Sequence, residues 1–250
     1  MSIVERPSTL RPPLKWAGGK RWQVPHLQPL WKTHSHRRLI EPFCGGLAVT
    51  LGLMPARALL NDANPHVINF YRWLQKGLRL DIPMENDETL FYQHRERFNT
   101  LLARGKGESL EAAAFFYYLN RTGFNGLCRF NRTGEFNVPF GRYARIRYTR
   151  DFTPYRDVFV DWTFTSTDME AVPLDRDEVR VGAHLAFPAR VDRRRIGREI
   201  DLVDLRLRKV RTRLIVHLTE RGRGEHDHRH GGHHGSRDEL RAAGPDLDAS

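Results

Sequence analysis

The stretch RLIEPFCGGLAVTLGLMPARALLND, residues 38–62, decides the fold of this 250-residue chain. A short apolar run, residues 38–43, is interrupted by a proline and followed by a Gly turn at residues 44–46. We predict a strand, the turn, a helix that begins near Leu47, and a second strand over residues 57–62. This strand carries a carboxylate, Asp62, at its end. Such an arrangement is the sequence pattern of a nucleotide-binding α/β half.

The segments around this unit predict further helices and a strand. A loop over residues 12–20 enters a helix at about Arg21, and another helix covers residues 65–78. Two more helices are predicted, at residues 87–104 and 110–121. The period-two alternation of residues 157–164 predicts a half-buried strand.

A second informative stretch, residues 120–143, interleaves four Arg, four Phe and four Asn with four Gly. Its apolar residues are too scattered for a buried helix or strand, and Thr133-Gly134 predicts a hairpin tip. Arginine reaches phosphates and guanine edges, Asn can pair with adenine, and aromatic rings insert among bases. Composition alone leaves two alternatives open: nucleic-acid contact, or an ordinary Gly-rich surface hairpin.

The charge is strongly uneven along the chain. The formal net charge is +11 and the sequence pI about 10.2, which favours a polyanionic partner. Residues 1–165 hold 24 Lys and Arg against 14 Asp and Glu, whereas residues 166–250 hold 17 against 16. Two cysteines and no apolar leader or membrane-length run lead us to expect a cytoplasmic chain with no membrane partner.

Two candidate site elements each allow a structural explanation. Asp62 suits the ribose hydroxyls of a nucleotide, but a carboxylate at a strand end also commonly caps the next helix. Trp16 and Lys20 flank a Gly pair, which suits stacking and charge contact with a carboxylate, or a turn with a half-buried indole.

Three blocks of the sequence, in this order along the chain, closely resemble the Dam family of DNA adenine-N6 methyltransferases. The blocks are LKWAGGK (residues 14–20), EPFCGG (residues 41–46) with Asp62, and residues 119–143. The resemblance covers about residues 14–168. It implies a Rossmann-like α/β domain that uses S-adenosylmethionine, with a helical lobe whose β-hairpin reads double-stranded DNA at a GATC-like site. For the chain itself we expect a monomer.

The resemblance assigns residues to both ligands. The cofactor would be held by Trp16, Lys20, Glu41, Phe43, Gly45 and Asp62. In the hairpin, Phe124 would insert into the duplex beside Asn125, while Leu127, Arg129 and Pro139 would touch base edges. Arg129 is the natural guanine reader, because its guanidinium pairs bidentately with O6 and N7. Phosphate contacts would come from Arg121, Arg142 and Arg145.

The family's catalytic motif, Asp-Pro-Pro-Tyr or a close variant, does not occur in the sequence, so no catalytic residue is predicted. Only one of the 26 aromatic residues, Phe187, follows residue 164, and the basic residues of 166–250 are 16 Arg and one Lys. We interpret residues from about Val179 onward as foreign to the family's C-terminal half. They are either an out-of-frame extension or a divergent lobe, and residues 196–218 have some helical tendency.

These expectations divide the chain into four parts: residues 1–80 and 151–178 in the cofactor domain, 81–150 in the recognition lobe, and a poorly ordered tail over 179–250, which leaves the sheet incomplete. The five His of residues 226–234 suggest adventitious chelation, and no metal is predicted. The sequence predicts an adenine methyltransferase of doubtful activity. Alternatives are a non-catalytic DNA-binding remnant and, from another substrate class, an RNA-modifying relative.

Overall fold

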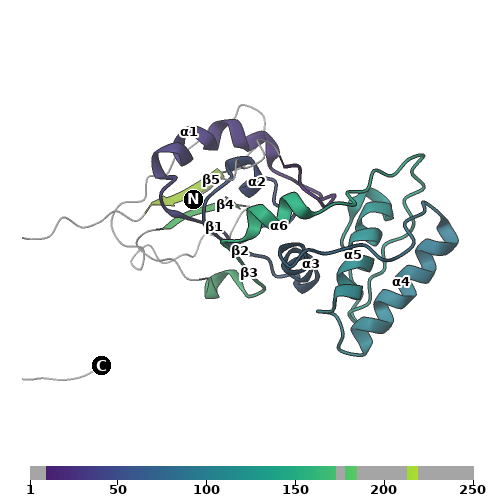
Figure 1. Ribbon diagram of the computed structural model, residues 1–250. Helices are drawn as coiled ribbons and strands as arrows, with labels where there is room; N and C mark the ends of the chain where they lie inside the picture. Colours follow the sequence, from purple (N-terminus) through teal and green to yellow (C-terminus); the bar gives the residue numbers. More distant parts are fainter. Residues whose placement is uncertain (1–9, 173–177, 185–212, 219–250) are drawn as a thin grey trace, which may run out of the picture. The chain divides into compact units, whose positions relative to one another are not determined.

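The computed structural model describes residues 10–172, 178–184 and 213–218 (Figure 1). Within them, five strands form one open sheet in the order β3-β2-β1-β4-β5. The strands are β1 (Arg38–Glu41), β2 (Ala58–Asn61), β3 (Trp162–Thr165), β4 (Glu178–His184) and β5 (Arg213–Leu218). β1 to β4 run parallel, whereas β5 pairs antiparallel with β4. The predicted α/β, Rossmann-like fold is confirmed.

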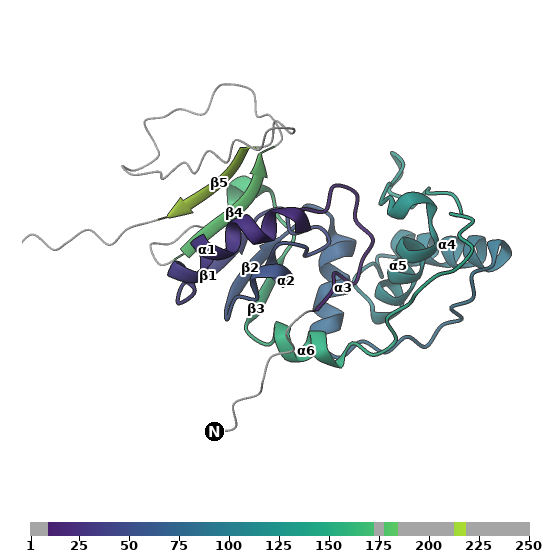
Figure 2. The same cartoon turned by 90° about the horizontal axis from the view of Figure 1, so that it is seen from above.

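Helix α3 links the sheet to a pair of helices, α4 and α5 (Figure 1). α3 packs on α6 and β3, and it also packs on α5, which lies beside α4 (Figure 2). No helix in the described ranges is long and apolar enough to cross a membrane. The helices are η1 (Arg21–Gln23), α1 (Val24–His34), α2 (Thr50–Leu53), α3 (Pro65–Gln75), α4 (Glu88–Ala103), α5 (Leu110–Thr122), η2 (Phe124–Gly126), α6 (Thr153–Phe159) and η3 (Met169–Ala171).

The side chain of Asn61 joins the segments that leave three neighbouring strands. It is 1% exposed, and its Nδ2 donates to Pro42 O at 3.1 Å and to Thr167 O at 3.0 Å. Its Oδ1 accepts from Thr165 Oγ1 at 3.0 Å. Parallel strands bring their carboxyl ends to one edge, where ligands of open α/β sheets bind. One buried amide therefore fixes the backbone at this edge.

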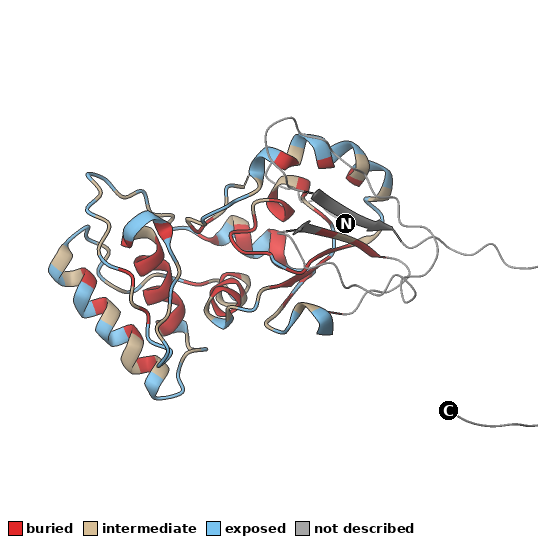
Figure 3. Ribbon diagram, turned by 180° about the vertical axis from the view of Figure 1, so that it is seen from behind, coloured by how far each residue is buried: buried red, intermediate tan, exposed pale blue. Residues whose placement is uncertain are grey.

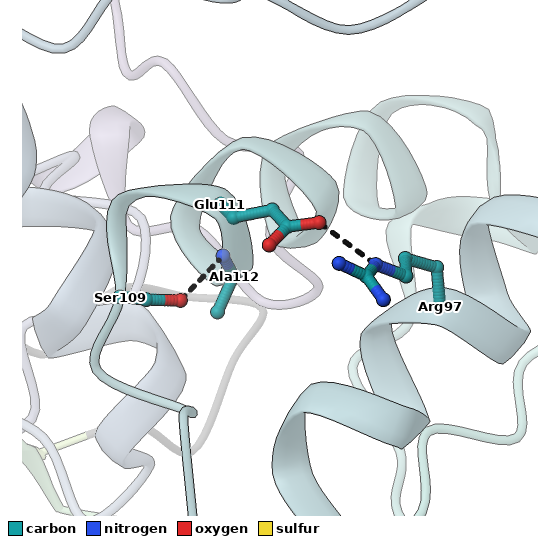
Figure 4. Close-up of polar contacts among 4 residues, drawn as sticks. All are labelled: Arg97, Ser109, Glu111 and Ala112. Carbon is teal, nitrogen blue, oxygen red and sulfur yellow. Dashed lines mark hydrogen bonds and ion pairs between the residues drawn. The ribbon is translucent and has the colours of Figure 1, made fainter. Parts of the chain in front are cut away.

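α5 is the central helix of the core and is buried on nearly all sides (Figure 3). The Tyr117 ring stacks on Phe70 of α3, with 5.4 Å between centroids and 6° between planes. At its start, Ser109 Oγ accepts from Ala112 N at 3.1 Å, and Glu111 Oε1 accepts from Arg97 Nε at 2.8 Å (Figure 4). The exposed ion pair contributes at most about 1 kcal/mol, so aromatic burial holds α4 and α5 together.

The first two strands and the four longer helices lie where the sequence predicts them. The strand predicted over residues 157–164 is wrong in its first part, because α6 continues to Phe159. Tyr155, Val158 and Phe159 are buried at the i, i+3, i+4 spacing of a helix face. The helix predicted near Leu47 begins at Thr50, since Leu47 has a φ of +61° and still belongs to the turn.

Residue 179, the predicted start of the poorly ordered tail, lies inside strand β4. Val179 and Val181 are 2% and 3% exposed, and Val179 pairs with Leu39 of β1. Two strands, β4 and β5, thus extend the sheet past the expected boundary. The predicted helical tendency is wrong at Arg213–Leu218, which forms β5. Residues 185–212 and the His-rich tract lie outside the described residues.

Candidate functional site

The turn after β1 is held by backbone bonds and covered by an indole. Cys44 N donates to Asn61 O at 2.8 Å, and Gly45 has a φ of +42°. A Cβ on Gly45 would lie 2.4 Å from Trp16 Nε1, and one on Gly46 would lie 2.8 Å from Trp16 Cβ. No side chain fits at either position while Trp16 stays in place. Trp16 therefore lies directly against the backbone of the turn, and glycine is needed at both positions because any side chain would collide with the indole.

Asp62 connects this turn to the start of α3. Its Oδ2 accepts from Gly45 N and its Oδ1 from Asn64 N, both at 2.9 Å, and burial raises the pKa of Asp62. The alternative that Asp62 caps the helix is wrong, because Asn64 Oδ1 accepts from His66 N at 3.0 Å and is the N-cap. A carboxylate has about four acceptor positions. Two of them remain on this half-buried side chain.

Glu41 lies beneath the turn and is 7% exposed. It accepts a hydrogen bond from Thr50 Oγ1, and burial raises the pKa of Glu41 to about 8 although this bond acts in the opposite direction. Tyr71 of α3 donates from its hydroxyl to Gly45 O at 2.6 Å. Sequence reasoning missed Thr50 and Tyr71, because one threonine in an apolar run and one tyrosine on a helix are typical of core packing.

The other two predicted cofactor residues lie at the surface. Phe43, at the start of the turn, is 49% exposed. Lys20 Nζ donates to Gly18 O at 2.7 Å within its own loop. The structure thus gathers Trp16, Glu41, Gly45 and Asp62 at one strand end, with Phe43 open to solvent beside them.

Lys15 joins this cluster to α5 and to the segment that follows it. Lys15 N donates to Asn120 Oδ1, and Asn120 Nδ2 donates to Lys15 O, both at 2.8 Å. Lys15 Nζ donates to Arg121 O at 2.7 Å and lies 3.5 Å from the centre of the Tyr143 ring. Burial, with the Arg121 charge, lowers the pKa of Lys15 to about 8. A Cβ on Gly126 would lie 2.5 Å from Lys15 Cβ. Sequence reasoning assigned Asn120 no role of its own.

Residues 123–140 form the predicted hairpin with two isolated bridges rather than a long ladder. Gly123 pairs antiparallel with Phe140, and Phe130 pairs with Phe136. At the tip, Gly134 has a φ of +82° and its N donates to Asn131 O at 3.1 Å. The hairpin tip predicted at Thr133-Gly134 is confirmed.

The side chains predicted to contact bases are all exposed to solvent. They lie near the two ends of the hairpin, where the chain enters it and where it returns. Phe124 is 46% exposed and Leu127 36% exposed, although both are large and apolar. Asn125 has a φ of +52°, a strained conformation for a residue with a side chain. Arg129 is held in place by Asn137, whose Oδ1 accepts from Arg129 Nε at 2.8 Å. The exposed set is Phe124, Asn125, Leu127, Arg129 and Pro139.

The three predicted phosphate-contacting arginines differ in accessibility. Arg142 and Arg145 are exposed, and Arg142 Nη2 lies 3.3 Å from Glu88 Oε1. Arg121 is half-buried and donates from Nη2 to Arg147 O at 2.6 Å. Arg121 therefore already supports the protein's own loop.

The comparisons with known proteins bear on this combination of a covered Gly turn and an attached hairpin. Residues 16–179 match the model of the D12 class N6 adenine-specific DNA methyltransferases. The chain belongs to this family. The match begins at the indole that covers the turn and ends on the second residue of β4. The D12 methyltransferase match thus includes the turn, Asp62 and the hairpin.

Similar proteins support the resemblance to the Dam family. The chain is 42% identical over 142 residues to a DNA adenine methylase of Salmonella typhi, and 40% identical to one of Escherichia coli K12. These matches cover 53% of this chain and 48% of the relatives. It is also 38% identical over 144 residues, 54% of this chain and 49% of the relative, to the type II methyltransferase M1.LlaDCHI of Lactococcus lactis. The chain spans about half the length of the curated relatives it matches.

The carboxyl end of β4 reaches the edge of the sheet that carries the Gly turn. Ile40 of β1 pairs with Arg180, so the residues after Arg180 lie level with the end of β1 and the turn. These residues are Val181-Gly182-Ala183-His184, and this described stretch contains no carboxylate. This D12-family chain therefore has an indole-covered Gly turn after β1 but no acid on the four residues that end the adjacent strand.

Proposed function

We propose that this chain binds S-adenosylmethionine at the turn after β1 and double-stranded DNA through residues 120–143, as part of a site-specific DNA adenine-N6 methyltransferase. The observation that carries the proposal is the position of the Lys15-Trp16 dipeptide. Trp16 lies against Gly45 and Gly46, while Lys15 bonds to Asn120 and contacts the hairpin backbone at Gly126. Methyl transfer to a base requires the cofactor and the target base to meet in one site, and this dipeptide touches both proposed binding elements.

The side chains at the turn fit the proposed cofactor, which would supply the methyl group. The free acceptor positions of Asp62 suit two ribose hydroxyls, while its bonds to Gly45 N and Asn64 N hold the carboxylate still. Phe43 offers an exposed ring for the adenine, and Trp16 and Lys20, both half-buried, would lie beside the cofactor. Glu41 and Gly45 shape the backbone beside the methionine part.

The hairpin fits duplex DNA with a GATC-like site. Phe124 would insert into the base stack beside Asn125, as apolar side chains do when they open a duplex. Arg129 would read guanine, with Leu127 and Pro139 against neighbouring base edges. Arg142 and Arg145 would contact phosphates without reading sequence. Arg121 would contact a phosphate only after its hydrogen bond to Arg147 O is broken.

A second function, DNA binding without catalysis, is favoured by the end of β4. Amino-group methylation of an extrahelical base requires acceptors that hold the N6 hydrogens and direct the nitrogen lone pair at the methyl group. The four residues ending β4 offer no side-chain carboxylate for this task. We propose that methylation by this chain is weak or absent, and that the sequence from about Val179 onward departs from the family through a shifted reading frame or divergence.

Two measurements test these proposals. Titration of the purified chain with S-adenosylmethionine should show saturable binding that weakens in Asp62→Ala, and robust methyl transfer to a GATC duplex would contradict the second function. Sequencing the coding DNA across codons 170–190 tests the shifted frame. An undisturbed frame, with no family-like continuation in another frame, would refute that explanation.

A further inference from the structure

The proposed cofactor turn and the proposed DNA hairpin meet at one peptide segment, Lys15-Trp16. On one side, the indole of Trp16 is in contact with the backbone of Gly45 and Gly46. On the other side, Lys15 Cβ lies against the backbone of Gly126, one residue after the exposed Asn125. A ligand that fixes Trp16 must therefore also restrict the position of Lys15 and of the hairpin strand beside it.

The side-chain amide of Asn120 holds this segment in place. It is 1% exposed, and its Oδ1 and Nδ2 bond to the N–H and the C=O of Lys15. This pair of bonds imitates one rung of a β-ladder between the N-terminal loop and α5. α5 continues into the hairpin, since Gly123 N donates to Leu119 O at 2.7 Å and Phe124 N donates to Pro139 O at 2.9 Å. Asn120 thus joins the cover of the Gly turn to the first residues of the hairpin.

A second and weaker link runs from Asp62 to the hairpin. Asp62 accepts from Asn64 N, and Asn64 Nδ2 donates to Cys128 Sγ at 3.2 Å. Sulfur is a weak acceptor, so this link contributes less than the two amide bonds of Asn120. It leaves some connection between the sites when Asn120 is removed.

We propose that Asn120 is a positioning residue that makes the binding of cofactor and of duplex mutually dependent. The inference rests on the proposed function, because it requires both ligands to bind. Coupling between two sites is reciprocal and commonly amounts to about 5- to 150-fold in affinity. Asn120 makes two neutral hydrogen bonds to Lys15, and each contributes about 1 kcal/mol. We therefore expect bound duplex to raise the affinity for the cofactor about tenfold, and most of this increase to depend on Asn120.

The test is a thermodynamic cycle measured on the full chain by isothermal titration. S-adenosylhomocysteine, which cannot donate a methyl group, is titrated with and without a saturating GATC-containing duplex. The variant is Asn120→Ala, and the matched control is Asn69→Ala. Asn69 is also buried, 5% exposed, and its Nδ2 donates to two backbone carbonyls, Gly107 O and Ser109 O, away from Lys15. Circular dichroism reports whether each variant is folded.

The expected result is a tenfold coupling factor in the wild type and in Asn69→Ala, falling to roughly twofold in Asn120→Ala. If Asn120→Ala does not fold, Asn120→Asp serves instead, because it keeps the acceptor for Lys15 N and loses the donor to Lys15 O. Wild-type affinities that are independent of the other ligand, or a full coupling factor in folded Asn120→Ala, would overturn the inference alone. A folded wild type that binds neither ligand would overturn the proposed function and, with it, the inference.

Discussion

Replacing Glu41 by Gln should remove a pH-dependent loss of stability. Glu41 is buried beneath the Gly turn and accepts a hydrogen bond from Thr50. Burial raises its pKa from 4.5 to about 8, so between these values the folded chain holds a proton that the unfolded chain releases. The stability that this carboxyl contributes is fully present below about pH 4.5 and is lost as the pH rises through 8. Glutamine has the same shape and can still accept from Thr50, but it cannot ionise.

The size of the effect follows from the two pKa values. One pKa unit corresponds to about 1.4 kcal/mol, so the wild type should lose roughly 3–5 kcal/mol relative to Glu41→Gln between pH 4.5 and 9. Burial lowers the pKa of His66 to about 4, which makes stability rise with pH between 4 and 6.5. His66 is present in both proteins, so its contribution cancels in the difference.

The measurement is urea denaturation of both proteins, followed by tryptophan fluorescence, at about pH 5, 7 and 9. The difference in the free energy of unfolding should be small at pH 5 and should favour Glu41→Gln increasingly toward pH 9. The exposed Glu96, changed to Gln, controls for the loss of one acidic group. A difference that stays constant across the three pH values would refute the reasoning.

Three further predictions concern binding and packing. Asp62→Ala should weaken S-adenosylmethionine binding by about 1.5–3 kcal/mol, measured by calorimetry, because charge-assisted hydrogen bonds are lost; unchanged affinity would exclude Asp62 from the site. Arg129→Ala should lower the difference in binding free energy between a GATC duplex and a duplex whose guanine is replaced by another base. The expected decrease is about 1–3 kcal/mol, measured by fluorescence anisotropy. An equal loss for both duplexes would instead indicate phosphate contact. Phe116→Ala, at a fully buried position of α5, should cost about 3–5 kcal/mol in urea denaturation, and a loss below 1 kcal/mol would contradict the core described.

The sequence predicts the first strand–turn–strand unit and the longer helices because local signals agree there. A proline, a Gly pair and Asp62 mark the turns, and α5 is long and apolar. The failure at residues 157–164 has a physical origin. Tyr155, Val158 and Phe159 lie on one face of a helix, while the alternation of residues 157–164 imitates a strand. β4 was missed because its residues carry no aromatic signal, and only pairing with β1 reveals it.

The site was predictable only where a residue type points to its chemistry. Three residues stand out in the sequence: Trp16, Asp62 and Arg129. Each combines a residue type with a position that few structural roles explain, namely an indole beside glycines, an acid at a strand end and an arginine in a hairpin. Asn120 and Tyr71 do not stand out, since an amide in a helix and a tyrosine on an apolar face are ordinary core residues. Their roles depend on contacts between segments 105 and 26 residues apart, which no local pattern encodes.

The proposed function requires one chain to hold a formed cofactor site attached to a DNA-reading hairpin. The most direct measurement is calorimetric titration of the purified chain with S-adenosylhomocysteine, followed by anisotropy with a GATC duplex and with a scrambled duplex of equal length. The expected result is one saturable cofactor site and tighter binding of the GATC duplex. A folded chain that binds no cofactor, or that binds both duplexes equally, would contradict it.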